Sequence, residues 1–300
     1  MNSIARVSRP TREQFEREFV AQNRPAVLTD TLQDWTALQK WTPEYLKSQL
    51  GDHRLSVAVA EDGRFRYGPD GHPLHHQQFL DAAAFLDHAS GAAPLDQSVR
   101  YAQSVSLPRE FPRLKGDVVP PVYIEGILRS TLMWFGQHGA TTCLHYDRMH
   151  NLMAMVRGRK RFLIFAPEDL PYLYHCDLQA YGPSVYFSLV DPEHPDEERF
   201  PEFRNATPLE VELNAGDMLY LPAFWWHHVN SYEFNIAVNY WWLPFPREVL
   251  DQMNEGIRSL GAAFPRLPPH WQRYVSLVCG HFFRAVGEPT GTAGATGPDR

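Results

Sequence analysis

The pattern His-x-Asp, which places two metal-ligating side chains two positions apart, occurs three times: HYD at 145–147, HCD at 175–177 and HPD at 194–196. The first lies in TTCLHYD, a run of β-branched and aromatic residues that predicts a strand. Side chains alternate between the faces of a strand, so His145 and Asp147 would point the same way without backbone strain. The other two triplets lie in a stretch crowded with proline, aromatic and acidic residues, and we interpret them as solvent-facing loop residues. The first pair is therefore the better candidate for a metal site.

A third ligand is expected from a distant strand, and the segment GDMLYLPAFWWHHV (216–229) offers His227 and His228. Residue spacing does not choose between these two histidines. Two histidines and one carboxylate on one face of a metal leave coordination positions open, an arrangement typical of non-haem Fe(II) oxygenases. The open positions would hold a chelating cosubstrate and O2.

Such a cosubstrate needs a cation for its second carboxylate, and Lys160, at the start of the run KRFLIF, is the best candidate. The alternative interpretation is that RGRKR (157–161) is a solvated hairpin tip around Gly158. Spacing alone favours neither interpretation.

The elements that must position these residues lie between about 120 and 245, where short β-branched and aromatic runs are broken by turns. They are residues 130–136, 141–147, 151–158, 160–165, 208–213, 217–223, 226–232 and 234–242. Consecutive strands with few helices between them predict an antiparallel sandwich or barrel. The segment 168–207 interrupts them as a long insertion, and such loops are usually functional or disordered.

Helical patterns precede this core in a mixed α/β lead-in. Helices are predicted at 11–22 and 43–50, where Thr11 and Thr42 can serve as N-caps. A third is predicted at 75–89, with an apolar side formed by Phe79, Leu80, Ala83 and Leu86.

Helical patterns also follow the core, over 246–285. An apolar stripe is spaced at steps of four, three and four residues, and it consists of Trp271, Val275, Val278 and Phe282. The last residues, 286–300, contain no large apolar side chain, and we predict that they are disordered.

The composition favours one domain in a reducing compartment. The chain has 300 residues, 44% of them apolar, and no shift in composition divides it. The net charge of −7 argues weakly against a surface for nucleic acid. Three cysteines without a CxxC pair suggest neither a disulfide framework nor a cysteine zinc site. With no export signal and no long apolar run, we expect a cytoplasmic protein without a membrane segment.

Four motifs together resemble the JmjC and cupin-like family of 2-oxoglutarate-dependent oxygenases, including its asparaginyl hydroxylases: LHYD, NLMAMVRGRKRFLIFAPED, GDMLYLPAFWWHHV and NIAVNYWW. The resemblance is strong over about 120–245 and extends weakly to the N-terminus. It implies a mainly β fold with flanking helices, the double-stranded β-helix or jelly-roll barrel, within a single domain at 1–285.

The resemblance also implies roles for individual residues. Fe(II) would be held by His145, Asp147 and His227, with His228 facing away. The distal carboxylate of 2-oxoglutarate would be bound by Lys160, Thr142 and Tyr101. Three further side chains would lie near the cosubstrate and metal: Asn151, Asn239 and Trp241. Tyr146 and Cys143 are expected in the core, and His150 receives no role.

The predicted function is hydroxylation of a side chain of a protein or peptide with Fe(II), 2-oxoglutarate and O2, which releases succinate and CO2. A groove lined partly by 168–207 would hold the substrate, and the acidic run DPEHPDEE would favour a basic one, unless it is only a solvated loop. Alternatives are an oxygenase for modified RNA, a methylated residue or a small metabolite, and a cupin that binds metal without catalysis. Similarity to the family further implies a homodimer through the C-terminal helices.

Overall fold

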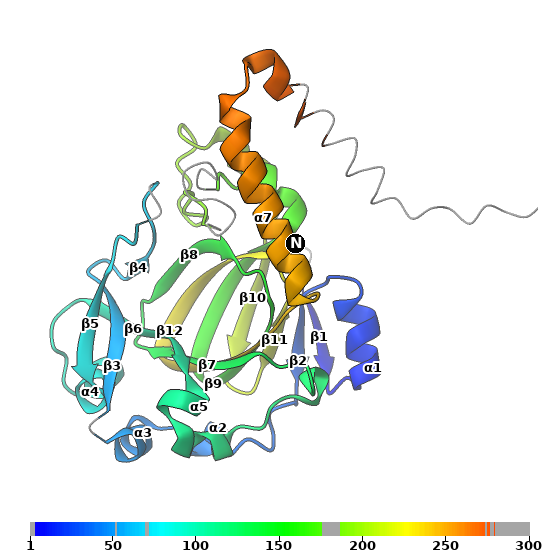
Figure 1. The fold of residues 1–300 in the computed structure, drawn as a ribbon. Coiled ribbons are helices and arrows are strands. Elements are labelled where there is room, and N and C mark those ends of the chain that lie inside the picture. The colour runs from blue at the N-terminus through cyan, green and yellow to red at the C-terminus, as the bar shows by residue number, and fades with distance from the viewer. Residues whose placement is uncertain are drawn as a thin grey trace, which may run out of the picture.

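One strongly curved sheet of twelve strands dominates the part of the chain that the structure describes (Figure 1). The computed structural model describes residues 4–51, 53–69, 72–175, 187–273, 275, 276 and 279. The strands are β1 (Ala5–Ser8), β2 (Ala26–Thr29), β3 (Arg54–Ala60), β4 (Arg64–Phe65), β5 (His76–Asp81), β6 (Val99–Ser106), β7 (Ser130–Gly136), β8 (Thr141–Tyr146), β9 (His150–Phe165), β10 (Leu209–Asn214), β11 (Met218–Leu221) and β12 (Trp226–Trp242).

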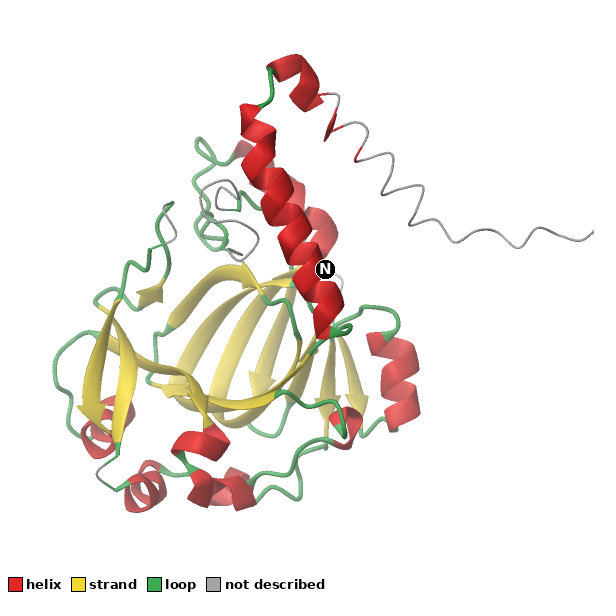
Figure 2. Ribbon diagram, viewed as in Figure 1, coloured by secondary structure: helices red, strands yellow, loops and turns green. Residues whose placement is uncertain are grey.

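The two longest strands, β9 and β12, form the centre of this sheet. β12 pairs antiparallel with β9 along most of its length and also with β7 and β8. β10 and β11 pair with different parts of β9, so the sheet folds over on itself. Figure 2 shows the resulting curved array of strands with the helices outside it. The predicted jelly-roll fold with flanking helices is confirmed.

A single strand, β9, replaces the two strands predicted on either side of Gly158. Gly158 has a φ of 69°, and a Cβ at this position would lie 2.6 Å from the carbonyl oxygen of Phe234 on β12. Glycine adopts this conformation at no steric cost, so the residue lies at an irregularity in the pairing with β12 inside one long strand. The alternative interpretation of residues 157–161 as a solvated hairpin tip is therefore wrong.

Helices lie outside the curved sheet. The α-helices are α1 (Arg12–Phe15), α2 (Ala37–Lys40), α3 (Pro43–Leu50), α4 (Ala82–Ser90), α5 (Leu107–Glu110) and α7 (Arg247–Ala263). One π-helical turn, Glu16–Val20, continues α1, and 3-10 helices occupy Pro112–Asp117, Val122–Ile124, Pro167–Tyr172, Pro201–Asn205 and Phe264–Arg266. The side chains of Thr11 and Thr42 accept hydrogen bonds from the backbone N–H groups of Gln14 and Tyr45, so both predicted N-caps are confirmed.

The helix predicted at 75–89 is only half correct. Residues His76–Asp81 form β5, which pairs antiparallel with β3, and Phe79 is 65% exposed instead of lying on an apolar helix face. The helix begins at Ala82 and buries Phe85 and Leu86. Pairing with β3 overrides the local helical spacing, because tertiary contacts outweigh weak local preferences.

Beyond the sheet, α7 rises away from the strands (Figure 1). None of the described helices is both long enough and apolar enough to cross a membrane. Two residues of the predicted apolar stripe, Val278 and Phe282, and the tail at 286–300 lie outside the described residues.

Candidate active site

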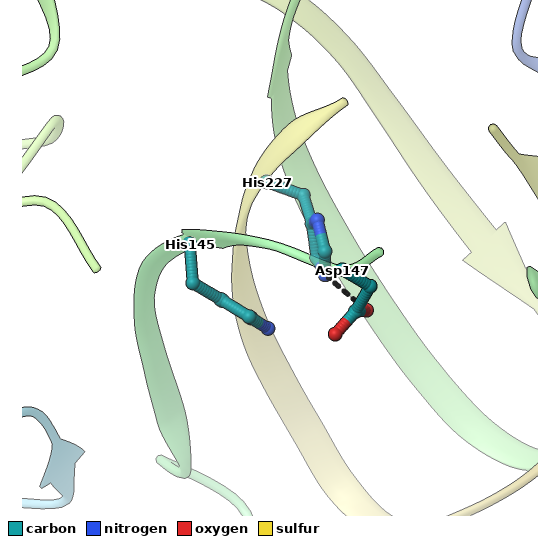
Figure 3. A group of neighbouring side chains, drawn as sticks. All are labelled: His145, Asp147 and His227. Carbon is teal, nitrogen blue, oxygen red and sulfur yellow. Dashed lines mark ion pairs between the residues drawn. The ribbon is translucent and has the colours of Figure 1, made fainter. Parts of the chain in front are cut away.

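Three side chains from two strand ends converge on one point (Figure 3). His145 lies near the end of β8, Asp147 follows that strand, and His227 lies at the start of β12. Their ligand atoms lie within 4.8 Å of one another, with 3.5 Å between His227 Nε2 and Asp147 Oδ2. Among the described residues, this is the one cluster of three or more His, Cys, Asp or Glu side chains with metal-site geometry. The structure thus brings together the three residues that the sequence predicted as ligands.

Backbone carbonyl groups orient both imidazole rings. His145 Nδ1 lies 2.7 Å from the carbonyl oxygen of Cys143, and His227 Nδ1 lies 3.1 Å from that of Trp225. A carbonyl oxygen can only accept, so in each ring Nδ1 carries the proton and Nε2 keeps its lone pair. This is the tautomer that a metal bound at Nε2 requires.

Burial sets the protonation of the three groups. It lowers the pKa of His145 to about 4 and holds the pKa of His227 well below its usual range. It raises the pKa of Asp147 to about 7. At neutral pH the imidazoles of His145 and His227 are both neutral. A divalent cation would bind the ionised carboxylate of Asp147 and displace the proton that burial favours there. The donor set fits a divalent metal such as Fe(II).

An irregularity in β8 aligns Thr142 with the metal-site residues. His227 is paired with His145, and Val229 is paired with Thr142. An advance of two residues along β12 therefore corresponds to three residues along β8. This β-bulge adds one residue and reverses the alternation of side chains. Thr142 therefore lines the same cavity as His145 and Asp147, although an odd spacing in a regular strand would separate them.

Lys160 is fully enclosed, with 1% of its surface exposed. Its ammonium group donates to Tyr101 Oη at 2.9 Å and to Ser231 Oγ at 2.5 Å, and it forms no ion pair with a carboxylate of the described residues. Burial lowers the pKa of Lys160 to about 7. A buried charge without a counter-ion is costly, so this environment fits a lysine that binds an anionic ligand.

A cavity of about 320 Å³ joins the metal-site residues to an aromatic wall. Tyr101 packs against two of its lining residues, Phe65 and Trp134, with ring centroids 5.7 and 5.9 Å apart. Tyr101 thus contacts the cavity lining directly, and Lys160 is connected to it through its hydrogen bond to Tyr101. The lining residues are Phe65, Tyr67, His75, Gln103, Ser104, Leu132, Trp134, Thr142, His145, Asp147, Met149, Phe187 and Trp241.

Buried polar atoms near this cavity lack hydrogen-bond partners within the described part of the chain. Asn239 Nδ2 donates to Asn151 Oδ1 at 3.0 Å, but Asn239 Oδ1 accepts no hydrogen bond. The indole N–H groups of Trp134 and Trp241 likewise have no acceptor. Buried polar groups in native proteins are nearly always satisfied, so these atoms fit a site that a ligand or ordered water completes.

An aromatic stack stands at the edge of the metal-site cavity. The rings of Tyr67 and Phe187 are stacked with centroids 3.8 Å apart, and Phe187 also forms an isolated β-bridge with His145. Phe187 belongs to the predicted insertion at 168–207, so that insertion does contribute to the site. Residues 176–186 of the insertion lie outside the described residues.

His228 faces away from the metal-site residues, as predicted. It is 3% exposed and, with Cys143, lines a separate cavity of about 300 Å³ beside β8. Its Nε2 lies 3.4 Å from Glu193 Oε2, and Glu193 also pairs with Arg161. Cys143 is half-buried at this cavity, so its predicted place in the core is wrong. Tyr146 is also only partly buried, but it packs against the buried ring of Trp226 at the edge of a core cluster.

The described residues of the other two His-x-Asp triplets do not belong to the metal-site cluster. His194 and Asp196 are exposed, as predicted for a loop. His175 is half-buried and forms an isolated β-bridge with Ser188, and Asp177 lies outside the described residues.

Two acidic residues of the run that contains His194 are paired, Asp191 with Arg64 and Glu193 with Arg161. Three others are exposed: Asp196, Glu197 and Glu198. The expectation that this run would favour a basic substrate stays a prediction.

Sequence reasoning missed Ser231, which accepts a hydrogen bond from Lys160. Ser231 lies four residues after His227, and a regular strand places such residues on one face. That alternation was the available signal. No local signal pointed to Tyr67 or Phe187, because their contact joins segments far apart in the sequence.

Sequence similarity to known proteins shows which family the chain belongs to. The cupin-like domain family matches residues 12–248, most of the chain. The chain belongs to the cupin-like family. This cupin-like protein is 34% identical over 261 residues to the human bifunctional peptidase and (3S)-lysyl hydroxylase JMJD7. The aligned region covers 78% of this chain and 81% of that protein. It is 30% identical over 255 residues to chicken tRNA wybutosine-synthesizing protein 5, with 81% of this chain and 77% of that protein covered.

A third relative is lysine-specific demethylase 8 of Xenopus tropicalis, 27% identical over 246 residues that cover 80% of this chain and 53% of that protein. The predicted membership of the JmjC and cupin-like family is confirmed. The predicted enzyme class, a 2-oxoglutarate- and Fe(II)-dependent oxygenase, is confirmed with it. The roles of individual site residues stay predictions.

Proposed function

We propose that this cupin-like enzyme hydroxylates a side chain of a protein or peptide with Fe(II), 2-oxoglutarate and O2, and releases succinate and CO2. One observation carries the proposal: His145, Asp147 and His227 converge in a barrel that also buries Lys160 without an acidic partner among the described residues. A metal-binding cupin without catalysis has no need of the buried lysine.

In this proposal His145, Asp147 and His227 hold the metal, and Lys160 with Thr142 and Tyr101 binds the distal carboxylate of 2-oxoglutarate. When bound, iron, cosubstrate and O2 supply the oxidising chemistry that converts a C–H bond of the substrate into C–OH.

The protein's own residues prepare the site for this chemistry. The carbonyl groups of Cys143 and Trp225 keep each Nε2 directed at the metal. Lys160 contributes a charge-assisted contact that burial strengthens. Asn151, Asn239 and Trp241 surround the cosubstrate in this proposal, and the aromatic wall limits access of water.

A protein or peptide substrate is supported by the name of the human relative, a lysyl hydroxylase. The cavity of about 320 Å³ is also lined by the aromatic side chains of Phe65, Tyr67 and Phe187, which suits an apolar portion of a substrate side chain. A second candidate, hydroxylation of a modified nucleoside in RNA, is supported by the 30% identity to a tRNA wybutosine-synthesizing protein. The net charge of −7 makes RNA the less favoured of the two.

The decisive experiment measures succinate formed from 2-oxoglutarate. Enzyme purified without oxygen and loaded with Fe(II) is assayed with and without air, with candidate peptides and with RNA. We expect O2-dependent turnover that a peptide stimulates and that His145→Ala abolishes, whereas His194→Ala, at an exposed loop histidine, retains it. Absence of turnover together with absence of iron and 2-oxoglutarate binding would refute the oxygenase, and stimulation by RNA alone would favour the second candidate.

We also propose a homodimer through the C-terminal helices, in the cytoplasm. α7 carries large exposed apolar side chains, with Val249, Met253 and Leu260 between 42% and 45% exposed, and Trp271 beyond it is 50% exposed. Sedimentation should show a dimer that Leu260→Glu dissociates. A monomeric wild-type protein at micromolar concentration would contradict this.

A further inference from the structure

We infer that His150 is a positioning residue of the metal site and acts through the turn Pro222–Trp225, which joins β11 to β12. The inference rests on the proposed binding of metal by His145, Asp147 and His227. It explains a buried histidine close to the metal-site residues that the proposed chemistry does not use.

The turn connects directly to two of the proposed metal ligands. The backbone N–H of Phe224 donates to the carbonyl oxygen of Asp147 at 2.7 Å. The carbonyl oxygen of Trp225 accepts the Nδ1 proton of His227, which follows two residues later. A shift of this turn would therefore change both the position of Asp147 and the orientation of the His227 ring.

The turn holds a conformation that needs support. Phe224 has a φ of 68°, in the left-handed region that side chains larger than glycine rarely adopt. Within the turn, the N–H of Trp225 donates to the carbonyl oxygen of Pro222 at 3.3 Å. The N–H of Ala223 has its partner outside the turn, on His150.

His150 supplies that partner from the first residue of β9. Its Nδ1 accepts the hydrogen bond of Ala223 N at 3.1 Å, and the hydroxyl of Tyr220 lies at the same distance. The ring is 7% exposed and packs 5.2 Å from the ring of Trp242, which fixes its position. Ala223 is 2% exposed, so without this acceptor its N–H would be buried and unsatisfied, and the turn would have to move.

One continuous set of contacts thus runs from the aromatic core through His150 to the backbone that orients the proposed ligands. Outer residues that orient metal ligands typically change metal affinity by about 10- to 100-fold when they are lost. An ordinary core histidine would change the stability of the fold and leave the metal geometry unaltered. This difference separates the two interpretations.

The test compares binding of Co(II) by the full-length metal-free protein. Affinity is measured by titration, and the geometry is read from the visible absorption bands of the bound Co(II). His150→Leu removes the acceptor, whereas His150→Asn keeps an oxygen close to the place of Nδ1. The matched control is His88→Leu: His88 is also buried, at 4% exposed, and its Nδ1 accepts the backbone N–H of Leu95 at 3.0 Å, outside the site.

We expect His150→Leu to weaken Co(II) binding about tenfold or more and to shift the absorption bands. His150→Asn should recover most of both, and His88→Leu should lower only the melting temperature. If His150→Leu does not fold, His150→Gln takes its place, since it moves the acceptor one bond further from the main chain.

Wild-type affinity and bands in His150→Leu, or equal changes in His88→Leu, would overturn the inference alone. Failure of the wild-type protein to bind Co(II) would instead overturn the proposed metal site on which the inference rests.

Discussion

Replacement of Lys160 by alanine should weaken binding of 2-oxoglutarate without affecting the metal. Lys160 is 1% exposed and forms no ion pair with a described carboxylate, so solvent does not screen its contact with a bound anion. A hydrogen bond to a charged group contributes about 1.5–3 kcal/mol. Since about 1.4 kcal/mol corresponds to tenfold in affinity, Lys160→Ala should raise the dissociation constant roughly 10- to 140-fold.

The assay is a calorimetric titration of 2-oxoglutarate into the Mn(II)-loaded protein. Arg159→Ala is the matched control, because it removes a positive charge from the preceding position of β9. The Arg159 side chain is 39% exposed and pairs with Glu212 at 3.1 Å on the surface, so its loss should leave the affinity unchanged. Unchanged affinity in Lys160→Ala, with Mn(II) still bound, would show that Lys160 does not hold the cosubstrate.

Three further predictions concern protonation and stability. Because burial lowers the pKa of Lys160 to about 7, the lysine must take up a proton to bind an anion above that pH. The affinity for 2-oxoglutarate should therefore fall by up to about tenfold per pH unit above 7. Equal affinities at about pH 7 and 8.5 would contradict this. The folded protein without cosubstrate disfavours the charged form of Lys160. At pH 7, Lys160→Met should therefore raise the free energy of unfolding by at least about 1 kcal/mol, measured by urea titration of the cosubstrate-free protein. A less stable variant would refute the argument. Gly158→Ala should lower the free energy of unfolding by more than about 2 kcal/mol, because the added Cβ would lie 2.6 Å from the carbonyl oxygen of Phe234. Gly216→Ala, at a φ of 98° but with open space around the Cβ, should cost less, and equal costs would refute the role of the close contact.

Local patterns carried much of the fold and the candidate site. Runs of β-branched and aromatic residues marked every strand of the barrel core, and the N-caps at Thr11 and Thr42 form as expected. The two-residue spacing of His145 and Asp147 was informative because alternation in a strand depends only on local backbone geometry. The choice of His227 over His228 came from resemblance to the family, and the structure agrees by turning His228 toward Glu193.

Predictions failed where the outcome depends on a distant partner. The two strands predicted at 151–158 and 160–165 form one strand, because pairing along β12 continues past Gly158. Residues 76–81 have helical spacing and nevertheless pair with β3. Cys143 was expected in the core and instead lines a cavity beside β8.

The sequence by itself determined which side chains are available for chemistry and which strands carry them, because side-chain type and strand alternation are local properties. Only the tertiary structure decided that Thr142 shares a cavity with His145, through a bulge against β12, and that Lys160 is buried without an acidic partner among the described residues. It also decided that His150 supports the turn before His227. Each of these depends on the register of strands far apart in the chain, and register is set by the packing of the whole barrel.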